Sequence, residues 1–230
     1  MKNRRRRDEP EEAVMSEKII ITISREFGTG GHLIGKRLAE KLGIAFYDNE
    51  LIQIAAKEMG FNENYIKNNE EKVPEFSFSG LFSGVAAYTS NPSDRIQEQQ
   101  FEKIRDIAEK ESCVIVGRAA DYILQDYPGR VSIFLFAPLE ARVRRLAQDT
   151  VHYKAYLPEE SYTEEQLIKA VKAIDKQRRK YYEFYTENQW GERDIYDLLI
   201  NTERTGIDGA IALIETYIKT GRGKDITSDL

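Results

Sequence analysis

Short apolar segments and helical patterns alternate along this chain. The apolar segments, which we expect to be strands, are residues 18–23, 44–48, 112–117, 131–138 and 197–202. The spacing of apolar positions and the end residues predict helices over 33–42, 49–60, 92–111, 139–148, 163–186 and 207–220. Strands that are apolar on both faces and alternate with helices form a parallel sheet between two helix layers. The sequence therefore predicts a three-layer α/β/α fold around a five-stranded parallel sheet.

The domain organisation follows from the same pattern. Residues 18–221 are expected to form one domain, between a disordered charged tail at 1–17 and a polar tail at 222–230. Met15 is a candidate native start, because the ordered pattern begins directly after it. Residues 61–91 mix aromatic residues with Ser, Gly and Pro and predict a loop-rich insert, and residues 149–162 predict an exposed polar loop.

The composition limits the classes of function. Hydrophobic residues make up 41% and charged residues 32% of the 230 residues, which is typical of a globular domain. The net charge of −5 argues against a dedicated nucleic-acid-binding protein, and no apolar run approaches the roughly 20 residues that span a bilayer. Cys113 is the only cysteine, so a reducing, cytoplasmic setting is the default expectation. The two histidines, His32 and His152, are too few and too separated for a zinc site, and no metal-ligand set is predicted.

A glycine-rich turn, "SREFGTGG" at residues 24–31, follows the first predicted strand. The N–H groups at a helix start and the helix dipole make such a turn a general anion site. One interpretation is a dinucleotide-binding turn, with glycines at Gly28 and Gly30 and with Asp48 as the ribose-binding acid about 20 residues on. A turn that only connects a strand to a helix is the structural alternative.

Another interpretation is a degenerate P-loop, whose usual pattern ends in a lysine followed by Ser or Thr. A literal match to that pattern uses Lys36, which lies inside the following helix and too far from the strand. Aligning the helix start instead puts Arg25 at the first glycine position and Gly31 at the lysine position. We hypothesise that Arg25, a bidentate donor, replaces the lysine. Ser24 or Thr29 could supply a hydroxyl for Mg²⁺, with binding through water and phosphate as the alternative.

Three further stretches, "SCVIVGRAADYIL", "LFAPLEARVRRL" and "IDKQRR", carry a family resemblance. Together with "RLAEKLG" in the first helix, they resemble the cytidylate kinase-like family of P-loop nucleoside monophosphate kinases. The similarity covers most of residues 18–220 and departs from the family pattern at the P-loop lysine, at Ile54 and at Ala119. The resemblance implies a P-loop, nucleoside monophosphate kinase-like fold that binds ATP and Mg²⁺ and phosphorylates a nucleoside monophosphate, with CMP or dCMP expected first. A non-catalytic nucleotide-binding protein and a dinucleotide-dependent oxidoreductase are the alternatives.

The resemblance also assigns site residues. The donor phosphates would bind at Gly28, Thr29, Gly30, Gly31 and His32. The acceptor would face Asp48, Arg118 and, as a looser counterpart, Asp121, with the insert 61–91 helping to bind it. Arg142 and Arg145 would border a closing lid at 149–162, and Arg178 would reach the transferring phosphate. Arg25 joins this catalytic set only through the separate hypothesis that it replaces the lysine.

The residues themselves leave the roles of these arginines open. On the helix 139–148, Arg142, Arg145 and Asp149 share one face at spacings of three and four, which is equally typical of a solvated surface. Arg178 lies on the apolar stripe of the helix 163–186, where a buried charge needs a partner. Asp175, one turn earlier, is the structural alternative to a bound phosphate.

Overall fold

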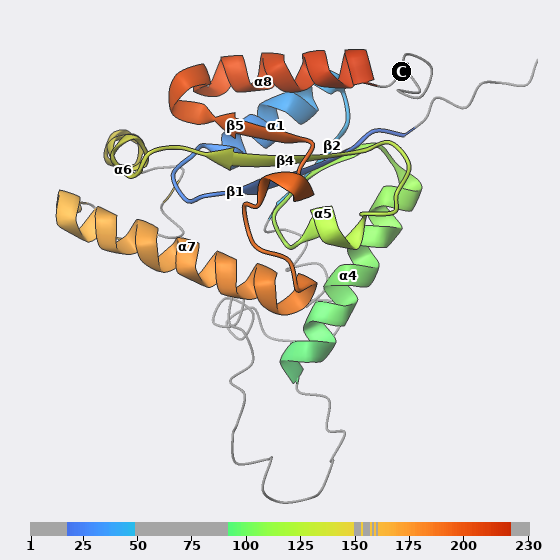
Figure 1. The fold of residues 1–230 in the computed structure, drawn as a ribbon, viewed down its shortest axis with the longest axis horizontal. Helices are drawn as coiled ribbons and strands as arrows, with labels where there is room; N and C mark the ends of the chain where they lie inside the picture. Colours follow the sequence, from blue (N-terminus) through green and yellow to red (C-terminus); the bar gives the residue numbers. More distant parts are fainter. Residues whose placement is uncertain are drawn as a thin grey trace, which may run out of the picture.

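The computed structural model describes residues 18–48, 92–149, 153, 157, 159 and 161–221. Five predicted features therefore lie wholly or largely outside the described residues: the tail 1–17, the helix 49–60, the insert 61–91, the lid 149–162 and the tail 222–230. The described part of the chain forms one sheet with helices on both faces (Figure 1).

The sheet has parallel strands in the order β2-β3-β1-β4-β5. They are β1 Ile20–Arg25, β2 Ala45–Tyr47, β3 Cys113–Val116, β4 Arg130–Phe136 and β5 Leu198–Asn201. The predicted five-stranded parallel sheet is thus confirmed. Because β1 lies between β3 and β4, the order differs from that of the dinucleotide-binding fold, in which the first strand pairs with the second. The dinucleotide-binding interpretation of the glycine turn is therefore incompatible with the sheet.

Helices cover both faces of the sheet. The described helices are α1 Gly31–Leu42, α4 Pro92–Lys110, α5 Ala120–Ile123, α6 Leu139–Gln148, α7 Glu164–Thr186 and α8 Thr202–Gly221, with a 3₁₀ helix, η2, at Arg193–Ile195. α1 and α8 lie over one face, and α4, α5 and α7 lie over the other (Figure 1). This arrangement confirms the predicted three layers.

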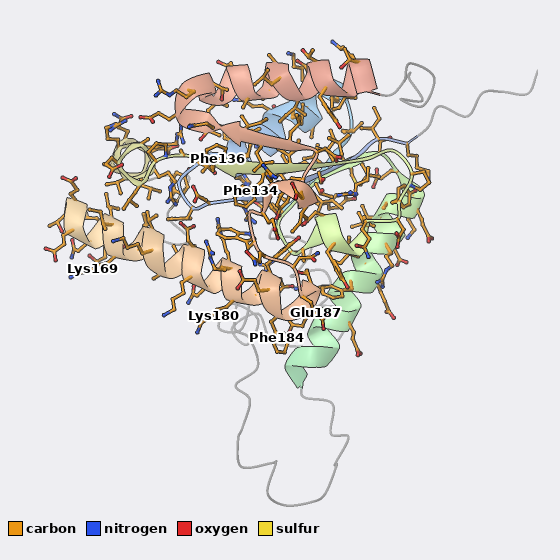
Figure 2. The ribbon with its side chains drawn as sticks, in the orientation of Figure 1. Phe134, Phe136, Lys169, Lys180, Phe184 and Glu187 are labelled. Atoms are coloured by element: carbon orange, nitrogen blue, oxygen red, sulfur yellow. The ribbon has the colours of Figure 1, made fainter. Side chains whose placement is uncertain are left out.

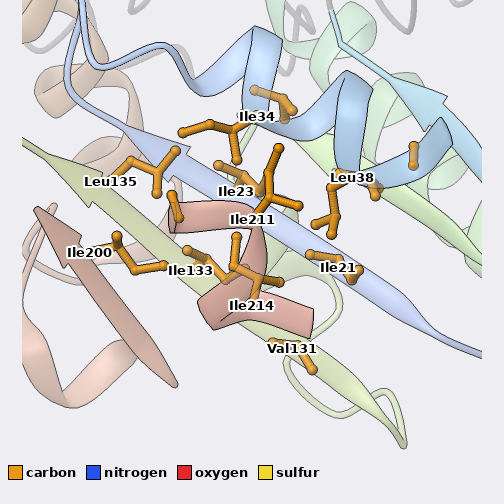
Figure 3. Close-up of a cluster of buried hydrophobic side chains, with 14 of the residues drawn as sticks. Ile21, Ile23, Ile34, Leu38, Val131, Ile133, Leu135, Ile200, Ile211 and Ile214 are labelled. Carbon is orange, nitrogen blue, oxygen red and sulfur yellow. The ribbon is translucent and has the colours of Figure 1, made fainter. Parts of the chain in front are cut away.

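The larger hydrophobic cluster fills the space between the sheet and the α1/α8 layer (Figure 3). Ile21 and Ile23 of β1 meet Ile34 of α1 and Ile211 of α8 there, and each of these side chains is 5% exposed or less. Ile20 points to the opposite face, as the period of a strand requires, and packs in the cluster beneath α4. Burial of each such side chain contributes about 1.5–3 kcal/mol, so β1 is anchored from both layers.

The helix α7 covers the other face beside the glycine turn. Figure 2 shows Lys169 and Lys180 of this helix pointing away from the sheet. Underneath, Tyr181 packs in a cluster with Phe134 of β4 and Trp190, and the rings of the last two meet edge to face at 5.3 Å. The aromatic packing fixes the position of α7 against the carboxyl end of β4.

Some element boundaries differ from the prediction. α8 begins at Thr202 rather than at residue 207, and Gly206, with φ 65° and ψ −175°, interrupts it with a kink. This conformation is open mainly to glycine, so a short first turn joins the main helix there. α5 and η2 are too short to show periodicity and were not predicted. α7 begins directly after Thr163, whose hydroxyl forms a capping box with Gln166.

Candidate functional site

The glycine turn lies at the carboxyl end of β1, directly before α1. Gly28 and Gly30 have φ values of 84° and 85°, which non-glycine residues rarely adopt. A Cβ on Gly28 would lie 3.0 Å from Cβ of Arg142, and one on Gly30 would lie 2.6 Å from Cδ1 of Ile207. No side chain caps the N-terminus of α1. The turn therefore has the backbone shape and the helix N–H groups of an anion site, as predicted.

The side chain of Arg25, the last residue of β1, runs between two glycines. A Cβ on Gly31 would lie 2.9 Å from Cγ of Arg25, and one on Gly117 would lie 2.1 Å from its Nη1. Gly117 also has a φ of 84°. The absence of side chains at both positions gives Arg25 its path from the glycine turn to the end of β3.

Asp48 lies between two cationic or potentially cationic side chains at the end of β2. One carboxylate oxygen is 3.6 Å from Nη2 of Arg25, and the other is 2.6 Å from Nδ1 of His32. Burial raises the pKa of this carboxyl, but the hydrogen bond with His32 and the charges of Arg25 and Arg118 outweigh burial and lower the pKa below its ordinary value. Asp48 is therefore ionised at neutral pH and links the end of β2 to Arg25 and to the first turn of α1.

The turn after β3 presents Arg118. Gly117, Arg118 and Ala119 have successive φ values of 84°, 61° and 52°, and the last two are not glycines. Such conformations cost of order 1–3 kcal/mol each and persist where the surroundings hold them. Arg118 is 8% exposed. The strained turn places Arg118 in the wall of a pocket.

This pocket, which we call the arginine pocket, is lined by Arg25, Arg118, Arg178, Tyr181 and Trp190, among others. Its arginines come from β1, from the turn after β3 and from α7. The structure thus brings together three of the arginines that the sequence analysis singled out. Three guanidinium groups beside a glycine turn form a site for a polyanion.

Arg178 enters the arginine pocket from α7. Its Nη1 donates a hydrogen bond to the carbonyl oxygen of Arg25 at 3.3 Å, and its guanidinium lies 5.4 Å from the centre of the Phe27 ring. Asp175, the alternative partner considered for Arg178, accepts hydrogen bonds from Arg142 and from the N–H of Phe27. Arg178 is therefore held against the glycine turn by backbone and ring contacts.

Arg142 is buried, at 7% exposure, so a solvated face is the wrong description for it. It forms a 2.5 Å ion pair with Asp175 of α7 and lies 3.5 Å from Glu26. It also donates hydrogen bonds to the carbonyl oxygens of Phe27 and Ala137. These contacts tie α6, α7 and the glycine turn together.

Arg145, one turn on from Arg142, contacts the other side of the glycine turn. Its Nη1 donates to the carbonyl oxygen of Gly28 at 2.9 Å, and its guanidinium also contacts Thr202. A second pocket, which we call the Tyr153 pocket, opens here and is lined by Gly30, His32, Leu33, Arg145, Asp149, Tyr153 and Ile207. The glycine turn therefore has a pocket on each side, and Arg145 borders residues of the predicted lid.

Asp121 is 3% exposed and lies beneath the arginine pocket. It accepts hydrogen bonds from Ser24 at 3.2 Å and from Tyr182 at 2.5 Å. Burial raises its pKa, although both hydrogen bonds act in the opposite direction. Asp121 thus supports two residues that line the pocket, and the hydroxyl partner Tyr182 was not anticipated from the sequence.

The hydroxyls considered for Mg²⁺ already donate within the protein. Ser24 donates to Asp121, and the buried Thr29 donates to the carbonyl oxygen of Glu26 at 2.8 Å. Among the described residues, no group of three or more His, Cys, Asp or Glu side chains could hold a metal ion. The described residues therefore offer no preformed set of carboxylate ligands, and Mg²⁺ would be bound largely through nucleotide phosphates and water.

Sequence comparison identifies the family of the chain. The profile of the cytidylate kinase-like family matches residues 20–204. The chain belongs to the cytidylate kinase-like family. Cytidylate kinases of Thermococcus sibiricus and Pyrococcus horikoshii are both 26% identical to it, over 207 and 204 residues respectively. The first alignment covers 89% of this chain and 90% of the Thermococcus sibiricus enzyme. The second covers 88% of this chain and 89% of the Pyrococcus horikoshii enzyme.

Solved structures place this member of the cytidylate kinase-like family among P-loop kinases in fold. The crystal structure of an uncharacterized protein from Eubacterium ventriosum is 33% identical, with a TM-score of 0.64, and the match covers 88% of this chain and 99% of that one. A shikimate kinase from Acinetobacter baumannii is similar in fold at 15% identity and a TM-score of 0.52, over 90% and 96% of the two chains. The predicted P-loop, nucleoside monophosphate kinase-like fold is thereby confirmed. No helix in the described ranges is both long and apolar enough to cross a membrane.

Proposed function

We propose that this protein transfers the γ-phosphoryl group of ATP to a small anionic acceptor, with CMP or dCMP as the first acceptors to test. The observation that carries the proposal is the convergence of Arg25, Arg118 and Arg178 on one pocket beside the glycine turn. Phosphoryl transfer consists mainly of positioning and charge neutralisation, which several fixed cations supply. A cytoplasmic setting belongs to the same proposal.

The two pockets suggest how the substrates divide. The backbone of residues 28–32 would bind the donor phosphates, with the rest of ATP on the side of the Tyr153 pocket, where Arg145 contacts the turn. The acceptor would occupy the arginine pocket, near Arg118 and Asp48. Mg²⁺, when bound with ATP, neutralises phosphate charge. The lid at 149–162 would close over the substrates and exclude water, and the insert at 61–91 would help to bind the acceptor.

Arg25 would supply the charge that the P-loop lysine normally provides. Its stem passes over Gly31, and its guanidinium lies between the glycine turn and Gly117. A planar guanidinium binds phosphate oxygens in pairs, which suits this position between donor and acceptor.

Isothermal titration calorimetry of ATP binding to Arg25→Ala tests this role. We expect the Kd to rise about 10- to 100-fold, since charge-assisted hydrogen bonds contribute about 1.5–3 kcal/mol. The exposed Arg37→Ala is the matched control, and an Arg25→Ala protein that binds ATP as tightly as wild type would contradict the assignment.

An ADP-release assay with ATP, Mg²⁺ and a panel of CMP, dCMP, UMP, AMP and GMP tests the activity. We expect one or more acceptors to stimulate ADP release. The second candidate function, a nucleotide-binding protein without turnover, is favoured by the glycine at the lysine position, Gly31. ATP binding without ADP release from any acceptor would support that second function.

A further inference from the structure

His32 and Asp48 form a pair that the proposed phosphate chemistry leaves unexplained. Nδ1 of His32, in the first turn of α1, lies 2.6 Å from Oδ2 of Asp48. The carboxylate side chain is 11% exposed, whereas the imidazole is 54% exposed. The ring also packs edge to face on Phe46, with 5.3 Å between the ring centres. The imidazole is therefore held by Asp48 and Phe46 and also lines the Tyr153 pocket.

The charges around Asp48 determine the tautomer of His32. The carboxylate is ionised, because His32, Arg25 and Arg118 together lower its pKa despite burial. An ionised carboxylate can only accept a hydrogen bond, so Nδ1 of His32 carries the hydrogen. Whenever the ring is neutral, its lone pair is therefore on Nε2. Arg145, Asp149 and Tyr153 line the same pocket as His32 and complete its charged surroundings.

A histidine held in this way has the arrangement of a general base. A phosphate acceptor needs no base, because it is already largely ionised near neutral pH, with a second pKa of about 6. A hydroxyl acceptor must lose its proton as it attacks. The pair is thus superfluous for transfer to a phosphate and appropriate for transfer to a hydroxyl.

We propose that His32, oriented by Asp48, is the general base of the reaction and that the acceptor receives the phosphoryl group on a hydroxyl. The proposal rests on the proposed ATP-dependent transfer and refines its acceptor. The hydroxyl proton moves to Nε2 of His32 as the oxygen forms its bond to the γ-phosphorus. The bond from that phosphorus to the β,γ-bridging oxygen breaks, and ADP leaves. Arg25 lines the arginine pocket and pairs with the same Asp48 that holds His32, so the base lies at the edge of the acceptor pocket. Arg118 and Arg178 in that pocket favour an acceptor that also carries a carboxylate or phosphate group.

Two probes test the assignment: water as the hydroxyl acceptor, in ATP hydrolysis without added acceptor, and CMP, which carries both a phosphate and ribose hydroxyls. Hydrolysis is measured with Mg²⁺ and ATP between about pH 5 and 8, the range in which imidazole side chains titrate. The product from CMP is identified by phosphorus NMR as a diphosphate or as a new phosphomonoester. ATP binding is measured separately by calorimetry.

We expect wild-type hydrolysis to rise with pH and His32→Gln to lower its rate on the order of 100-fold and to flatten the pH profile. The Kd for ATP should stay within about threefold, because the backbone of the turn is unchanged. Asp48→Asn should lower kcat with a similarly small change in the Kd, as a positioning residue requires. Glu40→Gln, on an exposed position of α1, is the matched control. A phosphomonoester product from CMP would also support the proposal.

Other results would overturn it. These are a His32→Gln rate within twofold of wild type, a rate loss that an equal loss of ATP affinity explains, or conversion of CMP to CDP. If the wild-type protein binds ATP but neither hydrolyses nor transfers it, the assignment of His32 as the base is wrong, and the proposed ATP site remains supported. A wild-type protein that binds no ATP overturns the proposed function itself, so the two failures are distinguishable.

Discussion

Replacing Gly31 with alanine should separate phosphate binding from folding. Gly31 is the first residue of α1, and the sequence pattern aligns it with the P-loop lysine. An added Cβ would lie 2.9 Å from Cγ and 3.2 Å from Cβ of Arg25, so the stem of the arginine must move. The contact involves the stem rather than the tip of the side chain, and the guanidinium is confined at the other end by Gly117. The displacement therefore shifts the group that we assign to phosphate.

We expect the substitution to change stability little and to weaken ATP binding strongly. Alanine is favoured over glycine inside a helix by roughly 0.5–1 kcal/mol, which offsets the local adjustment, so the free energy of unfolding should change little. Loss of the charge-assisted hydrogen bonds from Arg25 should cost about 1.5–3 kcal/mol of binding free energy. Since about 1.4 kcal/mol corresponds to a factor of ten, the Kd for ATP should rise about 10- to 100-fold.

The assay pairs isothermal titration calorimetry with thermal denaturation of the same protein. Gly209→Ala in α8 is the matched control, because its Cβ would meet only Thr205, at an ordinary 3.4 Å. This control should keep the ATP affinity of wild type. A Gly31→Ala protein that binds ATP with wild-type affinity would refute the role of Arg25. So would a protein that loses affinity only in proportion to lost folding.

Two further predictions concern stability. Arg142→Ala should lower the free energy of unfolding by about 3–5 kcal/mol, because it leaves partly buried carboxylates without their cation. Because 1 kcal/mol corresponds to about 2–4 °C in Tm for a chain of this size, the Tm of Arg142→Ala should fall on the order of 10 °C. Replacement of the exposed Arg144 with alanine is the control and should cost at most about 1 kcal/mol. Equal falls in Tm for the two variants would contradict the argument from burial. The pKa of Asp121 is raised in the folded protein, so the folded state binds the proton more tightly than the unfolded state. The resulting stabilisation is fully present below the ordinary pKa of 3.8 and is lost as the pH rises through the pKa of the folded state. Denaturant titrations should therefore show Asp121→Asn gaining stability relative to wild type as pH rises from about 4 towards neutrality, and a pH-independent difference would contradict this.

The sequence predicted the sheet well because each strand is a short apolar run that can be recognised from neighbouring residues alone. A run such as that in β1 is apolar on both faces, and only a doubly covered parallel strand buries both. The glycine turn was also readable, since Gly28 and Gly30 adopt backbone angles that few other residues accept. The start of α8 was missed, because Gly206 breaks the periodicity after its first turn.

The candidate site was only partly readable. Gly117 is visible in the sequence as the residue before Arg118. That its missing side chain leaves room for the guanidinium of Arg25 depends on β1 and β3 lying side by side. The burial of Arg142 was missed for the same kind of reason, since its partner Asp175 lies 33 residues away on another helix. The pairing of His32 with Asp48 joins α1 to the end of β2 and leaves no periodic signal.

By itself, then, the sequence determined the layered fold, the parallel sheet and a glycine turn at the end of β1. Those features follow from apolar periodicity and glycine conformations, which act within a few residues. Only the tertiary structure decided which charges meet: Arg25, Arg118 and Arg178 in one pocket, and Asp48 against His32. Such pairings depend on strand order and helix placement, because electrostatic partners are chosen by distance in space and by burial rather than by spacing along the chain.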